Sequence, residues 1–221
     1  MARDSRTHVA SVPRLVEQVL DEASLTIGAV EAIAVSIGPG SFTGLRIGLA
    51  FAQGLAYAGG LPVVGVSTLE ALAAVAPAEP GELVWAALDA RRHECWAACF
   101  RRTGAGLERL APDAAMSAAA LAERLGPETI VIGDAVERYG ALLAGRGRAL
   151  PFETFHPQGD VVARLGWERL ARGERDELGR LEPVYLRPPD ATVGRANPLP
   201  ASIGTDVARD HGVRLRSGER E

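Results

Sequence analysis

The residues most suggestive of chemistry form a loop rich in glycine and hydroxyl side chains, Gly38-Pro39-Gly40-Ser41-Phe42-Thr43. An apolar run precedes this loop and a helical pattern follows it, which is where backbone amides hold a nucleotide phosphate in many folds. A P-loop requires the pattern GxxxxGK[ST], and all 24 basic residues of the chain are arginine. A dinucleotide fingerprint requires GxGxxG, whereas the spacing here is GxGxxxG. The loop therefore matches neither phosphate motif, although amides at the start of the helix could hold an anion.

Two hydroxyls in this loop, Ser41 and Thr43, raise the alternative of a hydrolase. A nucleophile needs a base and an orienting acid, and His93, Asp89 and Asp134 are candidates for these roles elsewhere in the chain. The GxSxG pattern is absent, and no pair of carboxylates has a spacing typical of acid–base catalysis. A helix cap is the expected role of Ser41 or Thr43.

Two further polar features also favour structural roles. Cys95 and Cys99 form no CxxC pattern and have no histidine cluster at zinc spacing, so we expect two buried thiols. His93 lies beside Arg91 and Arg92 in a predicted turn, where an exposed loop histidine is the simplest interpretation. No metal, cofactor or catalytic residue is therefore predicted.

A second pattern lies in the helix that follows the loop. Gly44, Gly48, Ala52 and Ala56 recur every four residues and form a small-residue stripe, which lets another helix approach closely. Most of the remaining helix is apolar, so it must be covered on several sides. Either the other helices of the domain or another subunit could cover it, and the pattern alone leaves both open.

Hydrophobic periodicity and turn residues predict the elements that position these side chains. Helices are expected at 8–23, 41–58, 68–76, 117–125, 135–144 and 160–172. Strands are expected at 32–37, 62–67, 129–134 and 182–189, with a hairpin over 83–102 that turns near 89–92. The strand–helix order at the start favours a parallel sheet covered by helices. Residues 76–82 are the best internal boundary, and residues 191–221 are expected to be a disordered tail.

Composition restricts the partners and the compartment. The chain has 221 residues and a net charge of −4, which gives it no basic face for binding nucleic acid on its own. Residues 47–66 are apolar, but Gln53, the Gly59-Gly60 pair and Pro62 argue against a membrane helix. No signal peptide is expected at the start, so we predict a soluble cytoplasmic protein.

Four segments identify a family. AIAVSIGPGSFTGLRIGLAFAQGLAYAGGLPVVGVSTLEALA (32–73) closely resembles the signature of the TsaB (YeaZ) family. LDARRHECWAACF (88–100), IGDAVERYGALL (132–143) and EPVYLRPPDA (182–191) are similar to further family segments, in the same order. The resemblance covers about residues 8–191.

The resemblance implies an α/β protein of the actin-like ATPase (ASKHA) fold, with two ribonuclease-H-like subdomains. We expect residues 1–77 to form the first subdomain and 78–190 the second, with the 182–189 strand able to return to the first. Family members begin with strands that precede the first helix, and this chain starts almost at that helix. The first subdomain is therefore expected to be truncated, and a misassigned start codon or a partial gene is the expected reason.

The resemblance also implies a non-catalytic subunit of tRNA modification. TsaB pairs with the catalytic subunit TsaD, which transfers a threonylcarbamoyl group to N6 of adenosine 37 in tRNAs reading codons that begin with A. An ATPase, TsaE, joins the complex, and the TsaB subunit contacts tRNA only through that complex. A homodimer of the TsaB subunit can form when the partner is absent. The implied interface lies on the helices at 8–23 and 41–58, with candidates Leu15, Val19, Gly44, Arg46, Gly48, Ala52, Leu55 and Ala56.

Two alternative hypotheses assign the chain to an enzyme class instead of a non-catalytic subunit. The first is a peptidase-like hydrolase of the glycoprotease group that uses Ser41 or Thr43. The second is an ATP-binding actin-like enzyme, which the missing N-terminal strand and loop argue against, since these would carry the first phosphate contacts.

Overall fold

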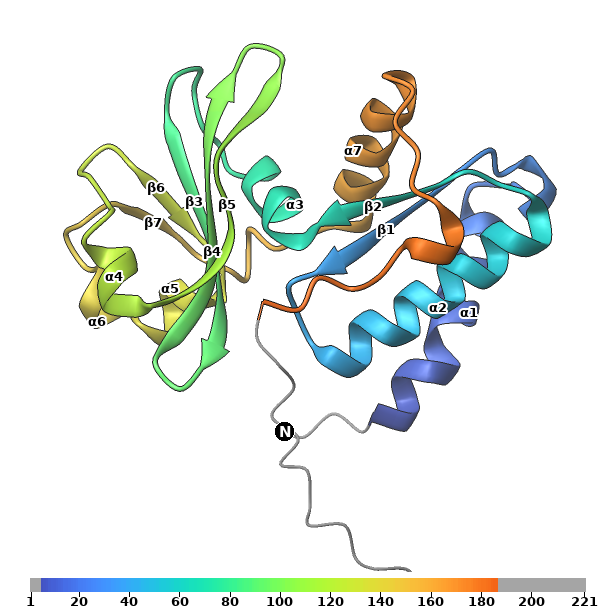
Figure 1. Ribbon diagram of the computed structural model, residues 1–221, viewed down its shortest axis with the longest axis horizontal. Coiled ribbons are helices and arrows are strands. Elements are labelled where there is room, and N and C mark those ends of the chain that lie inside the picture. The colour runs from blue at the N-terminus through green and yellow to red at the C-terminus, as the bar shows by residue number, and fades with distance from the viewer. Residues whose placement is uncertain (1–4, 187–221) are drawn as a thin grey trace, which may run out of the picture. The chain divides into compact units, whose positions relative to one another are not determined.

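Two sheets organise the chain, and their strands come from separate stretches of the sequence (Figure 1). The computed structural model describes residues 5–186, and their side chains from residue 11 onwards. The first sheet has two parallel strands, and the second has five strands in the order β5-β4-β3-β6-β7. The protein is therefore an α/β protein, as the alternation of strand and helix patterns predicts.

The first sheet and the helices on it span the N-terminal third of the chain, with one later helix added. Their bounds are α1 Ser5–Glu22, β1 Ile33–Gly38, α2 Phe42–Gly59, β2 Val63–Ser67 and α7 Gly159–Ala171, with short 3-10 turns η1 Ile27–Ala29 and η2 Leu178–Arg180. Ile33 is in register with Val63, and Ser36 with Val66. The predicted βαβ unit is thus confirmed.

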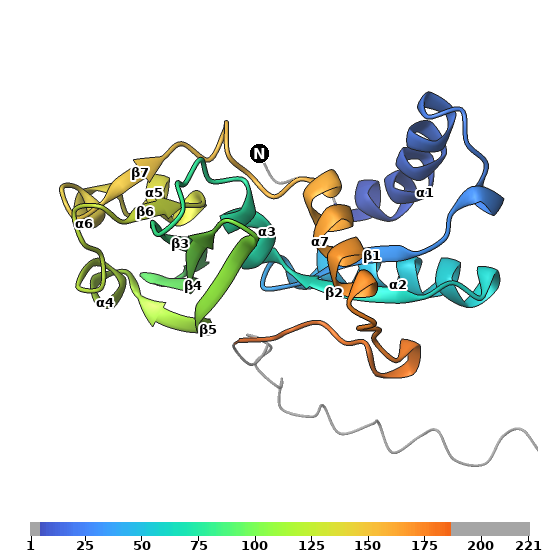
Figure 2. The same ribbon diagram turned by 90° about the horizontal axis from the view of Figure 1, so that it is seen from above.

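Alternate residues of β1 face different helices. Val35 and Ile37 pack with the cluster that contains Leu49 of α2, whereas Ala34 packs with the cluster that contains Leu165 of α7. Because side chains of a strand alternate between its two faces, α2 and α7 cover opposite faces of this sheet. Figure 2 shows α7 lying over β1 and β2 in the view from above.

The return of α7 to this sheet depends on a close backbone approach. A Cβ atom added at Gly166 would lie 2.5 Å from the Cβ of Ala34, so only glycine permits this packing. The helix at 160–172 is expected in the second subdomain, but it packs on the first sheet. The division of the chain into subdomains stays a prediction.

The second sheet mixes antiparallel and parallel strands. The bounds of its strands and neighbouring helices are β3 Leu83–Arg91, β4 Glu94–Thr103, β5 Gly106–Ser117, β6 Ile130–Ile132, β7 Arg148–Leu150, α3 Thr68–Ala74, α4 Ala118–Ala122, α5 Asp134–Arg138 and α6 Gly140–Leu143. β4 pairs antiparallel with both β3 and β5, whereas β6 pairs parallel with β3 and β7. The predicted hairpin over 83–102 is therefore present.

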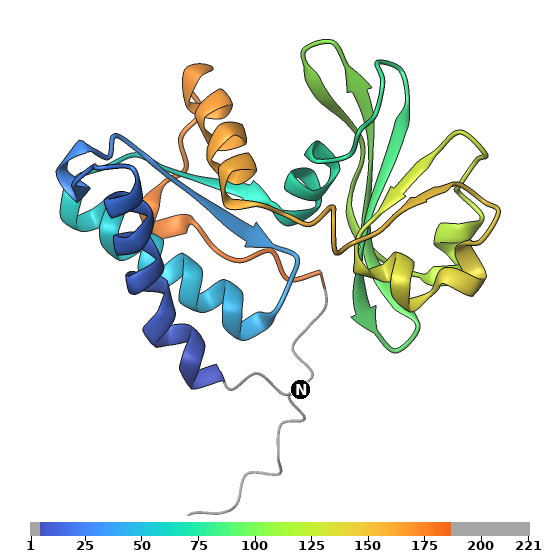
Figure 3. The same cartoon turned by 180° about the vertical axis from the view of Figure 1, so that it is seen from behind.

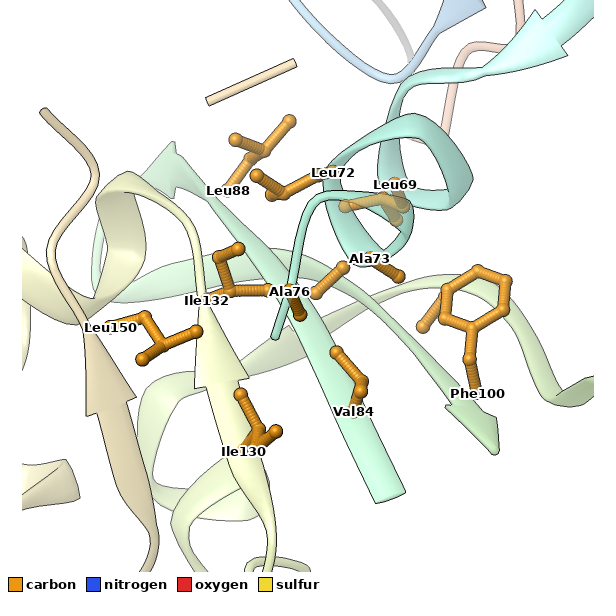
Figure 4. Close-up of a cluster of buried hydrophobic side chains, with 12 residues drawn as sticks. Leu69, Leu72, Ala73, Ala76, Val84, Leu88, Phe100, Ile130, Ile132 and Leu150 are labelled. Carbon is orange, nitrogen blue, oxygen red and sulfur yellow. The ribbon is translucent and has the colours of Figure 1, made fainter. Parts of the chain in front are cut away.

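Both faces of this sheet are buried. Val84 and Leu88 of β3 belong to the cluster on the α3 face, and Figure 4 shows them together with Leu69 and Leu72 of α3. Residues of the opposite parity in β3 pack with α4, α5 and α6 on the other face. Burial on both faces explains why the central strands are continuously apolar.

Several sequence predictions need correction. The helix predicted at 135–144 divides at Tyr139 into α5 and α6, and the helix predicted at 117–125 is shorter. β5 and β7 were not predicted, because β5 contains Pro112 and several charged residues and β7 has only three residues. These are the edge strands of the sheet, where polar residues and proline are tolerated.

The predicted strand at 182–189 is not a strand where the structure describes it. Residues 182–186 have no strand pairing, and Pro183 has no amide to donate. The amide of Val184 nevertheless donates to the carbonyl of Ile37 at 2.8 Å, which ties this segment to β1. Residues 187–189 of that prediction and the predicted tail at 191–221 lie outside the described residues. Among the described helices, none has the length and hydropathy needed to span a bilayer.

Candidate partner interface

The glycine-rich loop is held by packing. Gly38 has φ +110°, and a Cβ atom there would lie 3.0 Å from Cδ1 of Leu45 and 3.1 Å from the carbonyl oxygen of Val184. Gly38 and Pro39 are both buried. The loop therefore fixes the start of α2 against β1 and the segment around Val184, and its first glycine is required for that close approach.

Ser41 is the N-cap of α2, as predicted. Its Oγ accepts a hydrogen bond from the amide of Gly44 at 3.4 Å, and its carbonyl accepts the amide of Leu45 at 2.9 Å. Thr43 is exposed on the first turn of the helix. Among the described residues, neither hydroxyl is hydrogen-bonded to a carboxylate or an imidazole.

The candidate acids Asp89 and Asp134 lie together at the end of β3. Oδ1 of Asp89 accepts the hydroxyl of Tyr139 at 2.7 Å and the amide of Arg91 at 2.8 Å. Oδ1 of Asp134 accepts the amide of Asp89 at 2.7 Å, and burial raises the pKa of Asp134 above its ordinary value. The ring of His93 lies 6.4 Å from that of Tyr139. This network joins the β3–β4 turn to α5, which is a structural role.

Replacing Tyr139 by phenylalanine tests that role. The variant leaves Asp89 without its phenolic donor, so we expect the free energy of unfolding to fall by about 1.5 kcal/mol, as for a hydrogen bond to a charged group. Burial, followed by the hydrogen bond to Asp89, raises the pKa of Tyr139 to about 12. An unfolded tyrosine has a pKa of about 10, so this contribution to stability is complete below pH 10 and is lost as the pH rises toward 12.

Chemical denaturation between pH 8 and pH 12 measures this effect. The wild type should lose more stability over that range than Tyr139→Phe. Tyr57→Phe is the matched control, because Tyr57 is 82% exposed and its loss should leave the profile unchanged. Equal alkaline loss in wild type and Tyr139→Phe would contradict the proposed network.

The two cysteines are buried free thiols, as predicted. Burial, followed by the negative charge of Asp89, raises the pKa of Cys95 to about 11, and burial also raises the pKa of Cys99. Neither thiol is thus suited to act as a nucleophile near neutral pH. Within residues 11–186, no group of three or more histidine, cysteine or acidic side chains could hold a metal ion.

The small-residue stripe of α2 divides into two halves. Ala52 and Ala56 are only 6% and 1% exposed, and Ala56 packs with Leu49 and Val63; an interface role for these two alanines stays a prediction. A Cβ atom at Gly48 would meet no atom within 4 Å, and one at Gly44 would meet only Ser41. An i, i+4 row turns by about 40° at each step, so the stripe winds from an open side of α2 to its buried side.

Apolar residues are exposed on α1, which packs across α2 (Figure 3). Leu15 and Val19, one turn apart, are 56% and 62% exposed. Between the helices lies a cleft of about 430 Å³. The residues that line this cleft, together with the exposed Leu15 and Val19, are called the α1–α2 surface. Its members are Val12, Leu15, Val19, Arg46, Ile47, Ala50 and Phe51. Leu55 is half-buried, four residues after Phe51 on α2.

Arg46 is held at one end of this surface by two aromatic rings. Its Nε donates to the hydroxyl of Tyr185 at 2.9 Å, and its guanidinium carbon lies 4.0 Å from the centre of the Phe42 ring. The rings of Phe42 and Tyr185 are 5.2 Å apart. Sequence reasoning found Arg46 and Phe42 but missed Tyr185, because its segment was predicted to be a strand.

Comparisons with known proteins find relatives named for tRNA threonylcarbamoyladenosine biosynthesis. The family model of TsaD, tRNA N6-adenosine threonylcarbamoyltransferase, matches residues 3–155. The tRNA threonylcarbamoyladenosine biosynthesis protein TsaB of Escherichia coli K12 is 32% identical over 188 residues, which cover 82% of this chain and 81% of that protein. The protein of the same name from Haemophilus influenzae is 41% identical over 92 residues, covering 41% and 39% of the two chains.

A solved structure agrees with these sequence matches. YeaZ from Pseudomonas aeruginosa superposes with a TM-score of 0.70 and 34% sequence identity, and the match covers 82% of this chain and 85% of that one. Both the sequence and the fold are therefore shared over most of the chain. The chain belongs to the TsaB (YeaZ) family.

Proposed function

We propose that this protein is a non-catalytic subunit in tRNA threonylcarbamoyladenosine biosynthesis that acts by binding a TsaD-type catalytic subunit. The observation that carries the proposal is the match to Escherichia coli TsaB over most of both chains. In this proposal the TsaD-type subunit modifies N6 of adenosine 37 in tRNAs reading codons that begin with A. A TsaE-type ATPase joins the complex, and this chain meets tRNA only through its partners, in the cytoplasm.

The exposed α1–α2 surface supports this mode of action. Monomeric soluble proteins rarely expose a contiguous group of large apolar side chains without a function. Leu15 and Val19 project from α1, and Arg46 beside Phe42 supplies a charged group at the rim. An apolar centre with an arginine at its edge is a common composition for protein–protein interfaces.

In this proposal the α1–α2 surface also binds a second copy of this chain when the partner is absent.

The proposed fold is the actin-like ATPase (ASKHA) arrangement of two ribonuclease-H-like subdomains, the first around the β1–β2 sheet and the second around the five-stranded sheet. The matched family model of TsaD supports a shared ancestry of the two subunits. Paralogous subunits of one fold often associate through corresponding helices.

Size-exclusion chromatography with light scattering tests the proposal. This chain should elute with the TsaD-type subunit of the same genome as a one-to-one complex. Adding the complex to unmodified tRNA, with the TsaE-type ATPase, ATP and the threonylcarbamoyl donor, should yield the modified adenosine. Omitting this chain should remove most of the product. Product formation at full rate without this chain would contradict the proposal.

Replacing Ser41 and Thr43 together by alanine separates a scaffold from a hydrolase. We expect the activity of the complex to stay within about twofold of wild type, because within residues 11–186 neither hydroxyl is hydrogen-bonded to a carboxylate or an imidazole. The lost N-cap of α2 should lower the free energy of unfolding by about 1 kcal/mol. A variant with Thr43→Ala alone is the control, and it should retain that stability. Loss of all activity in the folded double variant would favour the hydrolase.

A further inference from the structure

One edge of β1 has no neighbouring strand within residues 5–186. On its other side β1 pairs with β2, where the amide of Ile33 donates to the carbonyl of Pro62 at 3.0 Å. Because alternate residues of a parallel strand bond to the same neighbour, the amides and carbonyls of Ala34 and Ser36 point to the opposite edge. The backbone groups of these two central residues are therefore open to pairing with another strand.

The other edges of the described sheets have features that oppose such pairing. The outer side of β2 is covered by Asp176, which bridges to Val63 and accepts the amide of Gly65 at 2.7 Å. β5 contains Pro112 and several charged residues, and β7 has only three residues. β1 has neither proline nor a charged residue over its whole length. Its free edge is therefore the one best suited to accept another strand.

An apolar pocket of about 410 Å³ lies beside the same strand. Its walls include Ala34 of β1 and Gly166, Trp167 and Leu170 of α7, and none of its described lining residues comes from β2. The pocket thus opens on the side of β1 that faces away from β2. Trp167 is 61% exposed there, and residues 33–37 stay half-buried although helices lie on both faces of the strand. A strand added at this edge would cover both.

The sequence of β1 reads almost the same in both directions, as Ile33-Ala34-Val35-Ser36-Ile37. In an antiparallel pair of two copies centred on Val35, Ala34 of one copy lies opposite Ser36 of the other. These residues carry the open backbone groups, so each such pair can exchange both of its hydrogen bonds. Ile33 lies opposite Ile37 on the α2 face, where both already pack with apolar residues. The edge is therefore complementary to itself in backbone and in side chains.

We propose that the free edge of β1 binds the same edge of a second copy of this chain. The two-stranded sheets then join into one sheet in the order β2-β1-β1-β2. Such an interface is isologous, and it closes at two copies because each copy has one such edge. The edge is distinct from the α1–α2 surface, whose members lie on α1 and α2. This inference goes beyond the proposed function and does not rest on it.

Amide hydrogen exchange measured by NMR on the whole chain, at rising protein concentration, tests the proposal. The amides of Ala34 and Ser36 should exchange faster than those of Ile33 and Val35 in dilute protein, and they should become protected as the concentration rises. Analytical ultracentrifugation should show the mass doubling over the same range. Protection of Ala34 and Ser36 that is independent of concentration would mean that a segment of the same chain covers the edge. That result, or a monomer without protection at high concentration, would overturn the proposal.

Ala34→Pro removes the amide that points to the free edge. Proline is tolerated at a sheet edge where its missing amide faces solvent, and the bonds of Ile33 and Val35 to β2 are unchanged. We expect the fold to be retained and the Kd of the dimer to rise at least about tenfold. A dimer of unchanged affinity in the folded variant would show that another surface joins the two copies.

Trp167→Glu is an independent variant that leaves the backbone of β1 intact. It places a charge beside the edge, so the Kd of the dimer should again rise at least about tenfold. Leu142→Glu is the matched control, because Leu142 is 49% exposed on α6, which packs on the five-stranded sheet. That control should dimerise as the wild type does. If Ala34→Pro does not fold, wild-type dimerisation of Trp167→Glu would overturn the proposal by itself.

The double variant Leu15→Glu with Val19→Arg separates this dimer from contacts through the α1–α2 surface. Its edge dimer should keep a Kd within about twofold of wild type, because the two sites share no residue. A dimer that is lost in this variant but kept in Ala34→Pro would assign the contact to α1 instead. Binding of the TsaD-type subunit is measured separately, so a failure of edge pairing leaves the proposed function untouched.

Discussion

Leu15→Glu combined with Val19→Arg is expected to weaken the complex with the TsaD-type subunit at least about 100-fold. Both side chains belong to the proposed α1–α2 surface and are more than half exposed on α1. An interface hot spot contributes about 2 kcal/mol or more, and placing two charged groups in a desolvated contact adds their desolvation cost. Each 1.4 kcal/mol corresponds to about a tenfold change in Kd.

The double substitution is designed to preserve the helix. Glutamate at 15 and arginine at 19 form an i, i+4 pair in the favourable order, and the net charge of the chain is unchanged. We therefore expect the free energy of unfolding to stay within about 0.5 kcal/mol of wild type. Thermal denaturation checks this point before binding is measured.

Glu17→Gln with Asp21→Asn is the matched control. These residues are also one turn apart on α1 and exposed, but helical spacing places them on the side away from Leu15 and Val19. Their loss should change Kd by less than about threefold. A complex that tolerates Leu15→Glu with Val19→Arg, or that fails equally with the control pair, would show that the partner binds elsewhere.

Gly133→Ala is expected to have the largest effect on stability. Gly133 lies between β6 and α5 with φ +123°, a conformation that residues with a Cβ atom rarely adopt. An added Cβ would lie 1.9 Å from the carbonyl oxygen of Ala87 and 3.0 Å from Cδ2 of Leu72. This carbonyl belongs to the backbone of β3, where Ala87 is paired with Ala97 of β4. It therefore cannot move away without disturbing the sheet.

We expect this substitution to lower the free energy of unfolding by at least about 4 kcal/mol, which is a large fraction of a typical domain's stability. The melting temperature should fall by about 10 °C or more, or the protein should be insoluble. Gly140→Ala is the control, since a Cβ there meets no atom within 4 Å and the residue begins α6. That variant should melt at or above the wild-type temperature. A Gly133→Ala protein that melts within about 2 °C of wild type would refute the argument.

Local patterns in the sequence were sufficient for the elements that are buried on both faces or that begin with a clear cap. The apolar runs of β1, β2 and β6, the hairpin of β3 and β4, and the Ser41 cap of α2 all follow from neighbours within a few residues. The loop at 38–43 also lacks the spacing of a phosphate motif, and the structure uses Gly38 for packing instead. The string over 32–73 was enough to indicate the family.

Other elements have no local pattern because their partners lie far away in the chain. β5 contains Pro112 and charged residues, and it is a strand because β4 offers it a free edge. The segment at 182–186 has an apolar pattern but forms no strand, since its contact with β1 is a single hydrogen bond from Val184. Pairing at a sheet edge is decided by the neighbouring strand more than by the residues of the strand itself.

Side-chain surroundings depended most on tertiary structure. The spacing of Gly48 and Ala52 suggests one continuous stripe, yet the pitch of the helix takes Gly48 to an open side and buries Ala52. The contact between Arg46 and Tyr185 joins residues 139 positions apart. The sequence alone therefore determined the family, the central strands and the helix starts. Only the folded chain decided which small and charged residues face water, because burial depends on contacts between segments distant in sequence.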